Sequence, residues 1–240
     1  VKLCGVGEVS PNCTKTSVVV SGVGSYSVNA SGVMSFVPEA NFTGTPAPLA
    51  YTVLDSTGQK AASTYTPTVI APPVVVPDVN SDAWDVTQSI DPLANDAAAS
   101  GLTLDVSSVK ICVTGTAINF CTGTTLVVAG QGTYSVNADG TVTFDPLPTF
   151  TGTATAIEYV VADSLGQKVS STITPTVGKP ALPTANPDTT SGPKGATQSI
   201  NLITNVDGAD AAGQAGVSLV ASSVKLCGVG EVSPNCTKTS

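Results

Sequence analysis

Six cysteines are the residues of this sequence best suited to covalent chemistry, and they fall into three equally spaced pairs. A disulfide within one pair would close a short hairpin loop, because the intervening residues include the turn formers Gly or Asn, and would stabilise it by about 2–3 kcal/mol. Free thiols are the alternative, whereas a lone Cys pair without His does not have a zinc-site spacing. We therefore predict disulfides, which are typical of proteins outside the cytosol, for Cys4–Cys13, Cys112–Cys121 and Cys227–Cys236.

Histidine and arginine are absent, and all nine basic residues are lysines. Without His the chain lacks the usual general base and the Ser/His and Cys/His nucleophile pairs. No pair of Asp or Glu residues stands out as a candidate for acid–base catalysis. A net charge of −8 without Arg also argues against nucleic-acid binding. We predict a protein that is not an enzyme, with no catalytic residues, no cofactor and no nucleic-acid partner.

One acidic stretch has the alternating spacing of a calcium-binding loop, and its candidate ligands are Asp78, Asn80 and Asp82. The equivalent stretch later in the chain keeps only the first acid, as Asp188. We therefore interpret residues 78–82 as a solvated linker, and the calcium site remains the weaker alternative.

The sequence repeats itself, which has to be recognised before the fold is assigned. Residues 1–17 recur unchanged as residues 224–240, and a diverged copy begins at Val109. The upstream stretch that begins at Pro77 has its own counterpart at Pro187. The repeats indicate a unit of two similar modules.

The repeats divide the chain into residues 1–71, the C-terminal part of a module, residues 72–178, a complete module, and residues 179–240, the N-terminal part of the next. Half a sandwich cannot bury its own apolar face. We therefore expect each half to be completed, either by adjoining segments of a long tandem array or by strand donation between separate subunits. The array is the simpler interpretation.

Composition and turn signals indicate β-structure throughout. Only 11% of residues are charged against 41% that are hydrophobic, which excludes a disordered acidic tail. Alternating apolar residues flank an N-x-D-G hairpin turn at residues 137–140, and D-S-x-G turns begin at Asp55 and Asp163. With Pro-rich stretches at residues 71–77 and 179–187, these signals predict an all-β protein of tandem immunoglobulin-like β-sandwich modules, end to end and joined by Pro-rich linkers. No apolar run is long enough to span a membrane.

Two long stretches, residues 22–59 and 130–167, share the pattern G-x-G-x-Y-x-V-N-x-x-G, then F-T-G-T and D-S-x-G-Q. They are very similar to the CshA-type fibril repeats of bacterial surface proteins, and TQSIDPLAND (residues 87–96) resembles another segment of that family. The resemblance implies a bacterial cell-surface location and a fibre or adhesin whose repeats form a stalk. The paired cysteines depart from the family pattern.

The expected partner is the protein itself, through adjacent repeats along a fibre or through lateral copies that exposed strand edges would permit. An adhesion ligand would bind at a distal tip outside this chain. In the alternative, the modules themselves bind a host or glycan ligand, which would require an aromatic cluster in every module. Aromatic residues are only 5% of the chain and form no such cluster. The single Trp, Trp84, lies near a module boundary, and we expect it to pack there.

Overall fold

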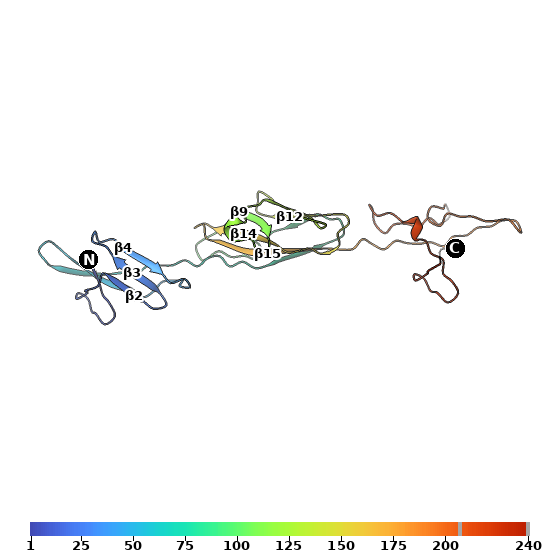
Figure 1. Ribbon diagram of the computed structural model, residues 1–240. Coiled ribbons are helices and arrows are strands. Elements are labelled where there is room, and N and C mark those ends of the chain that lie inside the picture. The colour runs from blue at the N-terminus through green and yellow to red at the C-terminus, as the bar shows by residue number, and fades with distance from the viewer. Residues whose placement is uncertain (206–207, 239–240) are drawn as a thin grey trace.

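The computed structural model describes residues 1–205 and 208–238, which form three bodies along an elongated chain (Figure 1). We refer to residues 1–71 as the N-terminal body, residues 72–178 as the middle module, and the described residues of 179–238 as the C-terminal body. The described residues contain fifteen β-strands and two short 3-10 helices, so the protein is all-β, as predicted. No helix in these residues could cross a membrane.

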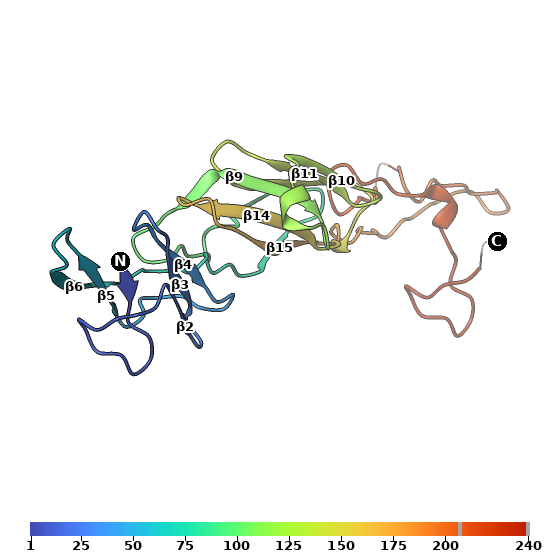
Figure 2. The ribbon, with the colours of Figure 1, turned by 60° about the vertical axis from the view of Figure 1, so that its left-hand side comes forward.

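The middle module is a sandwich of two sheets (Figures 1 and 2). The first sheet has the order β10-β11-β12-β8, formed by Thr125–Val128, Gly132–Val136, Val142–Pro146 and Gln88–Ile90. The second has the order β13-β15-β14-β9, formed by Gly152–Thr153, Lys168–Val177, Ile157–Asp163 and Leu104–Val113. A further strand, β7 (Asp78–Asp82), pairs in parallel with β15. All other pairings in these two sheets are antiparallel.

The core of the middle module lies between the two sheets. Tyr134 and Phe144 face it from the first sheet, with ring centroids 4.5 Å apart, and Tyr159 and Ile173 face it from the second. The predicted alternation of apolar residues around the N-x-D-G turn is therefore confirmed. Gly140 occupies the turn with φ +86°, and an added Cβ would lie 3.1 Å from Val106, so both conformation and space favour glycine.

The N-terminal body contains the strands of a partial sandwich (Figure 2). One sheet has the order β1-β5-β6, formed by Lys2–Leu3, Leu49–Leu54 and Lys60–Tyr65, and the other has the order β2-β3-β4, formed by Ser17–Val20, Gly24–Val28 and Met34–Pro38. A small core of buried residues joins them, made of Leu3, Val18, Tyr26 and Val28. Compared with the middle module, this body lacks the equivalents of β7, β8 and the first half of β9.

The described residues of the C-terminal body contain no strand, only a 3-10 helix (η2, Ala221–Ser223) and two isolated bridges, Thr184↔Ala211 and Leu226↔Lys238. Residues 197–200 have the same sequence, TQSI, as residues 87–90, which include β8. The difference has a simple cause. β8 takes its hydrogen bonds from β12, and the C-terminal body contains no equivalent of β12.

The first Pro-rich segment, residues 71–77, is not a free linker. Val74 forms a bridge with Ala97, and Val75 packs against the core, so residues 71–77 lie along the middle module.

Trp84 is buried at the other boundary of the middle module, where its indole N–H donates to the Pro148 carbonyl (3.0 Å). A Cβ added to Gly216 of the C-terminal body would lie 3.6 Å from this ring, so Trp84 packs at a module junction, as expected.

Candidate functional site

Three disulfide-closed hairpins recur along the chain. The structure joins Cys4 to Cys13, Cys112 to Cys121 and Cys227 to Cys236, with Cα–Cα distances of 4.2, 5.2 and 4.4 Å. The described residues contain no free cysteine. A covalent staple at the same place in each copy of the repeat identifies these hairpins as one architectural feature.

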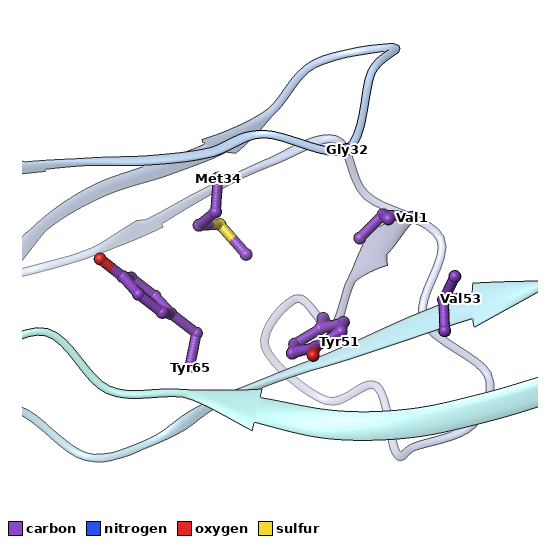
Figure 3. Close-up of a pocket in the computed structure, with 6 residues that line it drawn as sticks. All are labelled: Val1, Gly32, Met34, Tyr51, Val53 and Tyr65. Carbon is purple, nitrogen blue, oxygen red and sulfur yellow. The ribbon is translucent and has the colours of Figure 1, made fainter.

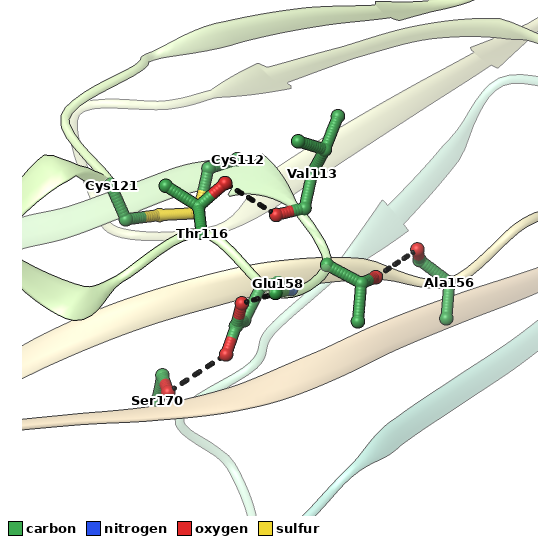
Figure 4. Close-up of a disulfide and its surroundings, with 9 residues drawn as sticks. Cys112, Val113, Thr116, Cys121, Ala156, Glu158 and Ser170 are labelled. Atoms are coloured by element: carbon green, nitrogen blue, oxygen red, sulfur yellow. Dashed lines mark hydrogen bonds between the residues drawn. A yellow bond between two sulfur atoms is a disulfide. The ribbon is translucent and has the colours of Figure 1, made fainter.

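The middle hairpin is also fastened to the neighbouring sheet (Figure 4). Its loop includes a 3-10 helix (η1, Ile118–Phe120). The Thr114 hydroxyl donates to the Ala156 carbonyl (2.6 Å), and the Gly115 N–H donates to Glu158 Oε2 (3.1 Å). Glu158 in turn accepts a hydrogen bond from the Ser170 hydroxyl (3.0 Å), so the loop is linked to both β14 and β15.

The two outer hairpins use a carboxylate of their own. Glu8 accepts hydrogen bonds from the Thr14 hydroxyl and from the N–H groups of Gly5 (2.8 Å) and Thr14 (3.2 Å). The hydroxyl of Thr14 and the N–H of Gly5 hold the pKa of Glu8 below its ordinary value. Glu231 makes the same contacts in the other copy. The hydrogen bonds that hold each of these two loops therefore come from a residue of the same hairpin.

We expect a double Cys112→Ser, Cys121→Ser variant to unfold about 2–3 kcal/mol more easily, because a short loop closed in the folded state is then free in the unfolded chain. Urea unfolding followed by Trp84 fluorescence measures this, since the only Trp lies in the middle module. The matched Cys4→Ser, Cys13→Ser variant should leave the Trp84 transition in place. Equal midpoints for wild type and the Cys112/Cys121 variant would contradict the prediction.

The calcium-candidate residues lie on strand β7, and the structure does not bring them together. The Asn80 amide donates to Gln88 Oε1 (3.0 Å), and Asp82 Oδ1 accepts from the Ala83 N–H (2.7 Å). Alternate residues of a strand are about 7 Å apart, so their side chains do not converge. Among the described residues, no cluster of three His, Cys, Asp or Glu could hold a metal ion.

The interpretation of residues 78–82 as a solvated linker is wrong. Asp78 is buried, and all five residues pair with β15 from Ile173 to Val177. The polar composition obscured this strand, because Asp and Asn are depleted in strands generally. The backbone of β15 supplies the pairing, and that partner is nearly a hundred residues away in the sequence.

The first residue of this strand, the buried Asp78, lies near a second carboxyl group, the half-buried Asp96, and this pair was not predicted from the sequence. The Tyr159 hydroxyl donates to Asp96 Oδ2 (2.7 Å) and lies 3.2 Å from the Pro92 carbonyl oxygen. Burial, and then the nearby negative charge of Asp96, raise the pKa of Asp78 to about 6. Asp78 Oδ2 has no hydrogen-bond partner. The only sequence signal was the PLAND segment that contains Asp96.

The D-S-x-G turns are organised by their aspartates, as predicted. Asp163 is buried, and its Oδ1 accepts hydrogen bonds from the N–H groups of Leu165 and Gln167, both at 2.9 Å. Its Oδ2 accepts from the Gln167 side-chain amide, also at 2.9 Å. The equivalent Asp55 is exposed. The Thr57 hydroxyl and the Gln59 N–H hold the pKa of Asp55 below its ordinary value.

The N-terminal body has an open apolar face (Figure 3). A groove of about 340 Å³ is lined by Val1, Gly32, Met34, Tyr51, Val53 and Tyr65. Val1 and Val53 are each 40% exposed, whereas the equivalent Val109 and Val161 of the middle module are fully buried. In the middle module this face is covered by the strands that the N-terminal body lacks.

Disulfide-stapled β-sandwich repeats, placed end to end, define a structural repeat module of the extracellular kind. The family model described as the surface adhesin CshA repetitive domain matches residues 8–69 and 91–177, more than half of the chain. The chain therefore belongs to the CshA repeat family and is a repeat segment of a cell-surface adhesin, a structural class of protein without enzymatic activity. No curated protein matches this sequence.

Proposed function

We propose that this chain is a stalk segment of a bacterial extracellular fibre or adhesin, in which the modules act as spacers. Each half-module is completed by an adjoining segment of a long tandem array. In such a stalk each module contacts mainly its neighbours, so the function requires a regular repeat and mechanical integrity more than a binding pocket.

The observation that carries this proposal is the recurrence of one module along the chain, with the same disulfide-closed hairpin in each copy. The complete copy, the middle module, has a fully buried core between its two sheets. A stable unit that repeats in this way suits a spacer, whose function depends on regular repetition. The disulfides add resistance to unfolding and proteolysis, which a surface fibre requires.

The distribution of aromatic residues argues against ligand binding by every module. Phe120, in the middle hairpin, is 78% exposed. Its equivalents in the outer hairpins are Asn12 and Asn235. A binding site built on Phe120 would therefore occur in one module type only. We place adhesion at a distal tip beyond these repeats.

Two measurements on bacteria that produce this protein test the proposal. An antibody raised against the middle module should label intact bacteria on extended surface structures. On denaturing gels, with and without reductant, the labelled polypeptide should be much larger than the 23.8 kDa of this chain. A labelled band near this mass under denaturing conditions would contradict the array, and labelling only after cell lysis would contradict the surface location.

A further inference from the structure

We infer that Trp84 of the middle module is a docking surface for residues 211–217 of the next module along the chain, and that this contact fixes the orientation of the two modules. This inference rests on the proposed function, because it names the surface through which neighbouring modules of the array touch. Three features support it: a very short connection, an aspartate that ties this connection down, and the indole ring itself.

The connection between the two modules has almost no free length (Figure 1). The Gly178 N–H donates to the Asp82 carbonyl (2.8 Å), so Gly178 is still attached to the middle module. The Ala181 N–H donates to Gln214 Oε1 (3.2 Å) and is already attached to the next one. Only residues 179 and 180, a Lys-Pro pair, lie between these bonds. Because proline restricts its own backbone and that of the residue before it, this tether is stiff as well as short.

An aspartate holds the connecting segment against the module that follows it. The Asn186 N–H donates to Asp210 Oδ1 (2.8 Å), and the Asn186 side-chain amide donates to the Ala209 carbonyl (2.9 Å). Thr184 forms an antiparallel bridge with Ala211, in which each N–H donates to the carbonyl of the other residue (2.9 and 3.0 Å). The connecting segment and the loop that begins at Ala211 therefore form one hydrogen-bonded unit.

The same arrangement occurs in the complete middle module, so it is a property of the repeat. There the Val76 N–H donates to Asp96 Oδ1 (2.8 Å), and Val74 forms a bridge with Ala97. Asp210 takes the place of Asp96 although the chain between TQSI and the aspartate is longer in the later copy. The contact is thus kept across an insertion.

The Trp84 ring closes the joint from the side of the middle module. Its indole N–H donates to the Pro148 carbonyl (3.0 Å), which orients the ring, and the side chain is only 8% exposed. Gly216, at the end of the tied loop, has φ +85° and lies against this ring, since a Cβ added there would be 3.6 Å from it. Glycine allows both the positive φ and the close approach of the backbone.

The two surfaces of the joint belong to different kinds of module. Lys194 stands in the later copy where the middle module has Trp84, and the loop of residues 97–101 is one residue shorter than that of residues 211–216. The apolar ring and the longer loop therefore form one matched joint in each two-module unit.

Nuclear magnetic resonance of the ¹⁵N-labelled 240-residue chain tests the joint. We expect backbone order parameters of about 0.85 for residues 211–217, equal to those of β14, because the loop and the middle module form one rigid unit. Trp84→Leu keeps an apolar side chain but removes the ring, and should lower the order parameters of residues 211–217 below about 0.6. Trp84→Lys, which introduces the residue type of the later copy, should do the same.

Variants on the other side of the joint separate docking from damage to the middle module. Asp210→Ala removes the acceptor of the Asn186 N–H and should free the loop in the same way, while the amide signals of β14 stay in place. Asp210→Asn keeps an oxygen that accepts this bond and should retain the wild-type order parameters. Phe120→Ser changes an aromatic side chain that is 78% exposed and should leave residues 211–217 unchanged.

The outcomes separate this inference from the proposed function. Wild-type order parameters below about 0.6 at residues 211–217 overturn the docking surface. So do unchanged values in Trp84→Leu and Trp84→Lys, and loss of order in Asp210→Asn contradicts the role of the aspartate as an acceptor. Surface labelling of bacteria is independent of these results. A protein absent from the surface would overturn the stalk function while leaving the measured joint intact.

Discussion

An Asp163→Ala variant should lose about 3–4 kcal/mol of the free energy of unfolding of the middle module. The Asp163 carboxylate is buried and accepts from two backbone N–H groups and one side-chain amide. Hydrogen bonds to a charged acceptor are the stronger ones, and truncation leaves the N–H groups of Leu165 and Gln167 without their acceptor. Urea unfolding at neutral pH, followed by Trp84 fluorescence, gives the difference.

The matched variant is Asp55→Ala, at the equivalent turn of the N-terminal body. Asp55 makes the same turn contacts but is exposed, so water replaces the lost acceptor. Its Trp84 transition should coincide with that of wild type. An Asp163→Ala midpoint equal to that of Asp55→Ala would show that burial of the turn carboxylate is not what stabilises the module.

Asp78→Asn should act in the opposite direction and stabilise the middle module by up to about 3 kcal/mol at slightly alkaline pH. The Asp78 carboxyl is buried, faces Asp96 and has one oxygen without a hydrogen-bond partner. An amide has nearly the same shape but no charge, so it removes both the burial cost of the carboxylate and its repulsion from Asp96.

The pH dependence follows from the raised pKa of Asp78. The folded state holds this proton up to about pH 6, whereas the ordinary value is 3.8. The stabilising contribution of the proton is therefore complete below about pH 4 and is lost as the pH rises through about 6. Unfolding midpoints of wild type and Asp78→Asn should coincide below about pH 4, separate as the pH rises from about 4 to about 6, and keep a constant difference above it.

A nearby control removes a charge without changing the Asp78–Asp96 pair. Asp85 is exposed, and Asp85→Asn should follow the wild-type midpoint at every pH. A constant gap between wild type and Asp78→Asn across the range would mean that proton binding by Asp78 is not coupled to folding. Tyr159, which donates to Asp96, is unchanged in both variants.

Local sequence patterns predicted the features that depend on near neighbours. The N-x-D-G hairpin before Thr141 and the turn at Asp163 rely on residues within four positions of each other, and both are as predicted. The Cys112–Cys121 bridge is also local, since its two residues are nine positions apart. Strand β7 was not predicted, because its composition is polar and its partner, β15, lies far along the chain. The Asp78–Asp96 pair was not predicted either, because it is positioned by β15 and by Tyr159 of β14, which are also distant in the sequence.

The duplicated segment shows most directly which structural features are determined by local sequence alone. Residues 1–15 and their copy, residues 224–238, both form a disulfide-closed hairpin with an internal Glu, at Glu8 and Glu231, because the disulfide and the contacts of the Glu lie within the segment. Repeat organisation and family membership likewise follow from sequence alone.

Tertiary structure decided which of these identical segments is buried. Leu3 is fully buried, because β1 pairs with β5 and packs against Tyr26, whereas the equivalent Leu226 is 51% exposed in a body without those strands. TQSI likewise contributes to a strand at residues 87–90 and not at residues 197–200. A strand obtains its hydrogen bonds and burial from partners far along the chain, so identical residues fold differently where those partners are missing.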